Sequence, residues 1–237
     1  MRKEGSLEIA PCGFQASSHS LTTVMALAWT TISALATAGG TLVLAIATFA
    51  SVRSANYAAR TAERAFQVGL RPVLFPSRLE DNEQRVRWVD DHWATISGGK
   101  ATMEEADGSI YMAMSLRNVG AGIAVLHSWR AEPLDIDRAR VPPRLEEFHA
   151  QSRDLYVPQG EISFWQAAIR DTEDPSWQEL RDAIHSGQSI VIDLLYSDHE
   201  GGQRAISRFT AIPPEEGQRE WLSTVVRHWN LDRADPR

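Results

Sequence analysis

This sequence lacks most of the features that identify an enzyme or a metal protein. It has one cysteine, Cys12, so no disulfide can form within the chain, which fits a reducing compartment. No Cys or His pair has the spacing of zinc ligands, and no G-x-S-x-G nucleophile motif is present. The run Asp198-His199-Glu200 is best interpreted as a solvated turn, because consecutive side chains diverge. We therefore predict no catalytic residues, no cofactor and no metal ion.

Charge is also absent from one long stretch. Residues 20–52 contain no Asp, Glu, Lys or Arg, and about 20 apolar residues suffice to cross a bilayer as a helix. A signal peptide places its basic residues beside an apolar run of roughly 7–15 residues, whereas Arg2 and Lys3 precede this longer run by about 17 residues. A buried core helix is the alternative. We predict a short tail over residues 1–20 and a transmembrane helix over residues 21–52.

The predicted span has aromatic residues near both ends. Trp29 and Phe49 would lie roughly 30 Å apart along a helix, about the thickness of the hydrocarbon layer. Aromatic rings favour the headgroup boundary. Ala36 and Gly40 form a small-xxx-small pair, a pattern that allows two helices to approach closely, so they are candidates for helix association.

The charges that flank the span predict its orientation, because Lys and Arg mark the cytoplasmic side. Arg2 and Lys3 are offset by two acids in the tail, whereas four arginines and only Glu63 follow the span within residues 53–71. We expect a single-pass protein of the inner or plasma membrane, with the N-terminus outside and the larger C-terminal part in the cytoplasm.

Residues 53–69 are predicted to continue the helix beyond the membrane, with Gly69 and Pro72 ending it. At 100° per residue, two stripes form on opposite faces. One is basic, and its members are candidate lipid-headgroup contacts: Arg53, Arg60 and Arg64. The other is a slim apolar stripe that suits helix association: Ala55, Ala59, Ala62 and Phe66. The segment packs against a second copy, lies near the lipid surface, or docks on the chain's own soluble domain.

The remaining residues, 70–237, are long enough for one domain with its own core. The chain has a formal net charge of -7, its tail contributes zero and residues 53–71 contribute +3, so about -10 remains for the rest. An acidic domain is a poor partner for nucleic-acid phosphates. We therefore expect no nucleic acid among its partners.

Alternating apolar residues and turn signals predict a mainly β domain. The expected strands are residues 73–75, 110–116, 123–131, 161–165, 190–196 and 204–212, the last two joined by a hairpin turn over 198–202. Two helices are expected, over residues 176–185 and, after Pro213-Pro214, over residues 215–229. Residues 79–107 are interpreted as a long hairpin or protruding loop, and residues 138–153 as a loop with a helical turn. The predicted fold is an antiparallel immunoglobulin-like β-sandwich with two helical additions and a C-terminal helix.

Four short segments carry a resemblance to a known class. They are Arg71-Pro72-Val73-Leu74, LRNVGAGIA at 116–124, VPQGE at 157–161 and YSDHEGG at 196–202. Together with the span and the Ala/Arg-rich helix, they make the chain similar to bacterial single-span membrane-anchored proteins of unknown function that carry a small β-sandwich. The resemblance implies fold and topology, and it transfers no catalytic residue.

Three of the eight tryptophans lie among charged residues and are candidates for a contact surface: Trp88, Trp93 and Trp177. The leading hypothesis is a membrane-tethered interaction or scaffold module that holds an unidentified protein, or a second copy of itself in a homo-oligomer, beside the bilayer. The alternative is a sensor that binds a small ligand and signals through the transmembrane helix. An enzyme of unknown reaction is the third hypothesis.

Overall fold

The computed structural model describes residues 18–215 and 217–232, so Arg2, Lys3 and Cys12 of the predicted tail lie outside the described residues. By its internal contacts the chain divides into two compact units, Met1–Ala62 and Glu63–Arg237. The first unit holds most of one long helix, and the second holds all of the β-structure.

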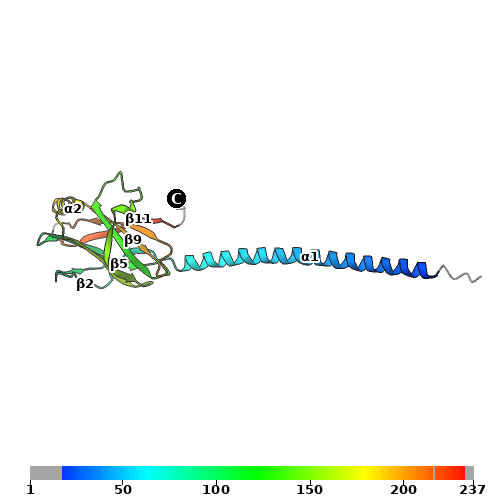
Figure 1. Ribbon diagram of the computed structural model, residues 1–237. Helices are drawn as coiled ribbons and strands as arrows, with labels where there is room; N and C mark the ends of the chain where they lie inside the picture. The colour runs from blue at the N-terminus through cyan, green and yellow to red at the C-terminus, as the bar shows by residue number, and fades with distance from the viewer. Residues whose placement is uncertain (1–17, 216, 233–237) are drawn as a thin grey trace, which may run out of the picture. The chain divides into compact units, whose positions relative to one another are not determined.

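Helix α1 (Ser18–Gly69) is continuous and covers the residues predicted as transmembrane and juxtamembrane helix (Figure 1). It is the one helix among the described residues that is long and apolar enough to span a membrane, with a mean hydropathy of 1.8 over its most apolar window. The predicted end at Gly69 is confirmed. Leu70 N–H donates to the Phe66 carbonyl at 3.2 Å, and Pro72 follows where a further turn would begin.

The second unit is mainly an antiparallel β-sheet that curls on itself (Figure 1). Its strands run in the order β1-β5-β4-β11-β10-β9-β6-β7, and β8 pairs with the other edge of β5. Their bounds are β1 (Leu74–Pro76), β4 (Lys100–Ala106), β5 (Ser109–Asn118), β6 (Ala124–Pro133), β7 (His149–Val157), β8 (Ile162–Ile169), β9 (Ile190–Ser197), β10 (Ala205–Ile212) and β11 (Trp221–Asn230).

Strand β7, at one end of this order, approaches β8. The side-chain amide of Gln151 on β7 donates to the backbone carbonyl of Gln166 on β8 at 3.0 Å, although no backbone ladder joins the two strands. The inward side chains of both halves of the sheet fill one core, which includes Met112 of β5, Leu126 of β6 and Ile192 of β9. The curl is thus held by apolar burial and leaves a seam between β7 and β8.

Of the two interpretations of residues 79–107, the hairpin is confirmed and the protruding loop is wrong for most of the segment. It forms the hairpin β2 (Gln84–Arg87) and β3 (Trp93–Ile96) and then β4. Val86, Trp88 and Ile96 are buried in a second apolar cluster against the outer face of β5, so that strand is covered on both faces. The apolar residues within this charged segment are therefore the buried side of a hairpin that packs on β5.

Most of the other predicted elements are confirmed, including the turn that joins β9 to β10. Helix α2 (Pro175–Ser186) was predicted over residues 176–185. The Asp174 carboxylate caps it by accepting from Ser176 N–H at 2.8 Å, and Gly187 ends it with a left-handed φ of 66°.

Two predictions for the C-terminal half are wrong. Residues 215–229 do not form a helix: residues 221–230 are β11, paired with β10 along its length. Within residues 138–153 the expected helical turn is found as η1 (Leu145–Glu147), but the segment does not end as a loop, because the chain enters β7 at His149. Both strands contain irregularities of register, which disguise the alternation that identifies a strand.

Candidate functional site

Helix α1 exposes a long apolar surface. Between Met25 and Val52, eleven large apolar side chains are exposed to more than half of their full area, among them Trp29 at 72% and Phe49 at 69%. Monomeric soluble proteins rarely expose contiguous apolar patches larger than a few hundred Å². This surface is therefore suited to lipid or to another apolar partner.

The hydroxyl groups within this apolar stretch are already satisfied. Thr37, Thr41 and Thr48 each donate to the backbone carbonyl four residues earlier, at 2.7–2.8 Å. In hydrocarbon, an unpaired polar group costs several kcal/mol, so this internal pairing is what a membrane environment requires. The polar residues of α1 are thus compatible with burial in a bilayer.

The residues predicted for helix association all lie on α1 and are exposed. A Cβ atom added at Gly40 would meet nothing within 4 Å, and Phe66 is 68% exposed. Phe66 also lines a recess beside Leu70 and the turn between β9 and β10. Helix association stays a prediction.

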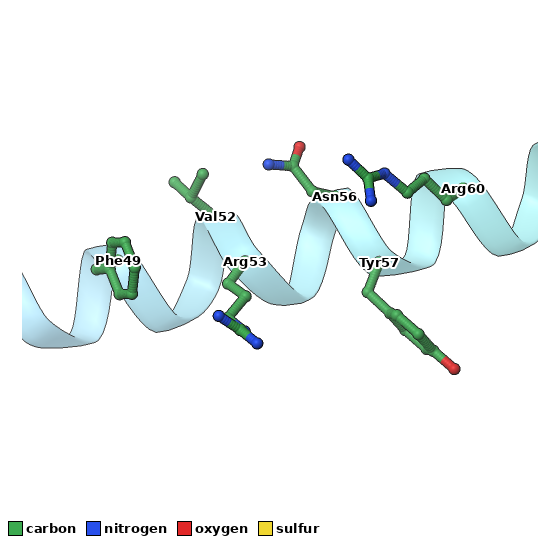
Figure 2. A pocket seen from close by; sticks show the side chains of 6 residues that line it. All are labelled: Phe49, Val52, Arg53, Asn56, Tyr57 and Arg60. Carbon is green, nitrogen blue, oxygen red and sulfur yellow. The ribbon is translucent and has the colours of Figure 1, made fainter.

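The basic stripe continues the apolar surface without a gap. Figure 2 shows the helix face where the two meet, with Phe49 and Val52 followed by Arg53, Asn56, Tyr57 and Arg60 around a shallow recess of about 450 Å³. All six residues come from one helix, so the recess is a hollow between side chains of successive turns. It presents arginine, amide and phenol donors directly beyond the apolar surface.

The candidate tryptophan surface is largely buried. Trp88 is 3% exposed and donates its indole N–H to the Ala167 carbonyl at 2.9 Å, and Trp177 is 9% exposed on the inner face of α2. The expected exposure is therefore wrong for these two residues, since each completes an apolar cluster. Trp93 is 57% exposed on β3, with the Arg87 guanidinium 5.4 Å from its ring centre.

The seam between β7 and β8 forms a groove of about 330 Å³ that the sequence did not reveal. Its lining comes from four separate segments of the chain: Trp88, Val89, Trp129, His149, Ala150, Gln151, Ser152, Gln166, Ala167, Ala168 and Arg170. The imidazole of His149 stacks on Trp129, with ring centres 4.6 Å apart. The lining contains a cation but no carboxylate, on a domain that is acidic overall.

Two buried oxygen atoms of this lining have no hydrogen-bond partner among the described residues, namely Gln151 Oε1 and Gln166 Oε1. Both amide NH₂ groups point at backbone carbonyls, which fixes the orientation of the amides and leaves the oxygens as acceptors. A buried acceptor left unpaired costs about 1–3 kcal/mol. The groove can therefore accept hydrogen bonds from water or from a ligand that carries donors.

Arg170, which lines the groove, is hydrogen-bonded to the β2–β3 hairpin. Its Nε donates to Asp90 at 2.9 Å, and Tyr111 donates its hydroxyl to the same carboxylate at 2.7 Å. The hydrogen bond from Arg170 holds the pKa of Asp90 down at about 2. The pKa of Tyr111 is raised, first by burial and then by the neighbouring carboxylate.

A row of charged side chains crosses the sheet on the face away from the main core. Asp193 of β9 is fully buried and accepts two hydrogen bonds from Arg208 of β10, at 2.7 and 2.8 Å. Arg130 of β6 approaches the same carboxylate at 3.2 Å and also pairs with Glu147, at 2.9 Å. Arg208 donates to two backbone carbonyls of residues 138 and 139, so the network fastens that loop to the sheet.

No group of three or more His, Cys, Asp or Glu residues within the described parts of the chain is arranged to hold a metal ion. Comparison with known proteins adds no assignment: no family model matches the chain, and no curated protein matches it.

Proposed function

We propose that this protein is a membrane-tethered interaction module, held in the inner or plasma membrane by α1 with its β-domain in the cytoplasm. The exposed apolar surface of α1 carries the proposal, because its hydroxyl groups are paired within the helix and basic residues follow it. The second unit has a core of its own, so the tether confines a folded domain to the bilayer surface.

Extraction of membranes from expressing cells with alkaline carbonate tests the anchor. The full chain is expected to stay in the membrane pellet, and the double variant Leu42→Arg/Ile46→Arg to be released, because each arginine at the centre of a span costs about 2.5–3.5 kcal/mol. The matched control Ala55→Arg/Ala59→Arg adds the same charge outside the predicted span and is expected to stay in the pellet. Release of the unmodified chain would refute the anchor.

The β2–β3 hairpin is the proposed contact surface for a protein partner. Trp93 is exposed there, and Val89 at the tip is 90% exposed. Large aromatic side chains are enriched at binding hot spots. Trp88 serves the fold of the hairpin and is not part of this surface.

Photo-crosslinking from position 89 in membranes of expressing cells tests this surface. A discrete crosslinked product is expected, and Trp93→Ala is expected to reduce its yield at least fivefold. Tyr156→Ala, which removes an aromatic ring of similar exposure from β7, is the matched control and is expected to leave the yield unchanged. Equal yields of the crosslinked product from the parent chain, Trp93→Ala and Tyr156→Ala would exclude Trp93 as a hot spot.

The second candidate function is a ligand sensor, and the groove at the β7–β8 seam favours it. Its volume lies at the lower end of the range for small-molecule sites, and Gln166 Oε1 is a buried acceptor with no hydrogen-bond donor beside it among the described residues. Thermal-shift measurements with hydroxyl- and amine-bearing compounds would test it. Compounds that stabilise the full chain are expected to lose their effect in Gln166→Leu, which removes the unpaired acceptor without changing the volume much.

A further inference from the structure

The polar face in Figure 2 begins immediately after the apolar surface of α1. Arg53 is the first charged residue after Glu8, and no carboxylate occurs between Glu8 and Glu63. Asn56, Tyr57 and Arg60 follow within two turns of the same helix and line the same recess as Arg53. The face therefore combines two cations with two neutral hydrogen-bond donors and has no internal acid to neutralise it.

The helical repeat places these four side chains together. At 100° per residue, Arg53, Asn56, Tyr57 and Arg60 fall within an arc of about 100°. Figure 2 shows the guanidinium group of Arg60 pointing back toward Asn56. This direction is general, because side chains on an α-helix lean toward its N-terminus, which on α1 is the side of the apolar span.

The height of the face matches the headgroup layer. The polar layer on each side of a bilayer is about 5–7 Å thick, and a helix rises about 1.5 Å per residue. If the helix axis is normal to the membrane, the Cα atoms of Arg53 and Tyr57 lie about 1.5 and 7.5 Å further along it than the Cα atom of Val52. Arg60 lies about 12 Å along it and reaches back toward the same layer.

We propose that Arg53, Asn56, Tyr57 and Arg60 form a binding site for the phosphate of an anionic phospholipid. The inference rests on the membrane anchor proposed above. Guanidinium groups bind phosphate oxygens through charge-assisted hydrogen bonds, and the amide and phenol groups donate to the remaining oxygens. A choline lipid carries its own ammonium group, which two arginines repel, so the site distinguishes anionic from zwitterionic lipids.

Arg64 lies outside this site although it shares the basic stripe. Its Cα atom is about 18 Å beyond Val52, and the carboxylate of Glu63 is its neighbour in the sequence. It therefore provides a matched control, since Arg64→Gln removes the same charge as Arg53→Gln from the same face. A non-specific attraction between the helix and an anionic surface would depend on the three arginines more evenly.

Electron spin resonance of spin-labelled lipids tests the proposal with the full chain in phosphatidylcholine vesicles. The probes are trace amounts of spin-labelled phosphatidylglycerol or phosphatidylcholine, and the readout is the fraction of each that the protein immobilises. Immobilised phosphatidylglycerol is expected to exceed phosphatidylcholine by threefold or more. Arg53→Gln is expected to abolish this preference, and Arg60→Gln to lower it, since each arginine near the surface contributes about fivefold in affinity. Arg64→Gln is expected to keep it.

The other outcomes separate the site from the anchor. Equal immobilisation of the two lipids by a chain that co-floats with the vesicles overturns the lipid site and leaves the anchor standing. A chain that does not co-float overturns both. Loss of the preference in sodium phosphate, but not in sodium chloride of equal ionic strength, shows that the face binds free phosphate and overturns the lipid assignment.

Discussion

At the scale of single residues, the chain places charge where its neighbours can neutralise it. Asp193 interrupts the apolar run of β9, yet its carboxylate is paired on both sides by arginines of the adjacent strands. Arg208 also lies 4.9 Å from the centre of the Trp229 ring, which covers it from β11. These buried charges are therefore tolerated because the side chains of β6, β9 and β10 pair with one another, and the loop carbonyls accept further hydrogen bonds from Arg208.

Replacing Asp193 with Asn is expected to lower the free energy of unfolding by about 3–5 kcal/mol, because two buried guanidinium groups lose their shared counter-charge. Urea unfolding of the full chain in detergent, followed by near-UV circular dichroism, measures the change. The control is Glu80→Gln, which breaks an ion pair whose side chains are mostly exposed, and it is expected to cost less than about 0.5 kcal/mol. A loss below about 1 kcal/mol for Asp193→Asn would contradict the assigned pairing.

Tyr196 predicts how stability responds to alkaline pH. Burial raises the pKa of its hydroxyl above the ordinary value of 10.0, so the folded state holds this proton more tightly than the unfolded state. Its contribution to stability is complete below pH 10 and falls as the pH rises toward the folded-state value. Urea unfolding of the full chain between pH 8 and 11 is expected to show this decline, and Tyr196→Phe is expected to flatten it.

Tyr196→Phe is also expected to lower the free energy of unfolding at pH 8. The Tyr196 hydroxyl lies 2.8 Å from the Ser207 hydroxyl and accepts from the Leu74 amide at 3.4 Å, so removing it should cost about 1–3 kcal/mol. Tyr156→Phe alters an exposed ring and is expected to change stability by less than about 0.5 kcal/mol. An unchanged alkaline slope in Tyr196→Phe would show that this hydroxyl does not govern the decline.

At the scale of elements, β11 shows how a strand can imitate a helix. Trp221, Ser223 and Val225 face the main core, and then a bulge opposite Arg208 shifts the alternation so that Arg227 and Trp229 face the other side. The resulting spacing of apolar residues also fits one face of a helix, and Pro213-Pro214 before it suggests a helix start. Pairing with β10 decides between the two, and residues near β11 in the sequence do not reveal it.

The segment between α1 and β1 is held by close backbone contacts. Gly122 packs so tightly on it that an added Cβ atom would lie 1.8 Å from the Leu70 carbonyl oxygen. Nearby, the amides of Val119 and Ala121 donate to the carbonyls of Val73 and Arg71, at 2.9 and 3.1 Å. The turn between β5 and β6 therefore fixes where the chain enters the β-domain.

Gly122→Ala is expected to displace this segment, because the contact is with backbone that cannot rotate away. Hydrogen exchange of the Val119 and Ala121 amides should accelerate tenfold or more, measured by mass spectrometry on the full chain in detergent. Gly69→Ala is the control, since a Cβ atom there meets nothing within 4 Å, and it is expected to leave these amides unchanged. Unchanged protection in Gly122→Ala would show that the contact is not rigid.

At the scale of the whole molecule, an apolar helix and a β-domain with its own core make up two units of one chain. The charges around the helix predict that the domain lies in the cytoplasm. This orientation decides which proteins and which lipid leaflet the domain and the basic face can meet.

Labelling with a membrane-impermeant maleimide measures the orientation, because Cys12 is the single cysteine of the chain. In intact cells, Cys12 is expected to react. The companion variant Cys12→Ser/Val89→Cys moves the thiol to an exposed position of the β-domain and is expected to react only after permeabilisation. The opposite pattern would reverse the assigned topology, and the search for partners would move to the outer side of the membrane.

The sequence alone determined the long helix with its end at Gly69, six strands of the main sheet with the turns after β5 and β9, and the extent of α2. These features depend on neighbouring residues: a run without charge, alternation over a few positions, or a Pro before and a Gly after a helix. The immunoglobulin-like grouping of the strands stays a prediction.

Only the tertiary structure decided the identity of β11 and β7, the burial of Trp88 and Trp177, the pairing of Asp193 with its arginines, and the groove between β7 and β8. Each of these depends on residues far apart in the chain that meet when the sheet curls. The free energy of such contacts comes from burial and pairing across strands, and no local pattern in the sequence encodes it.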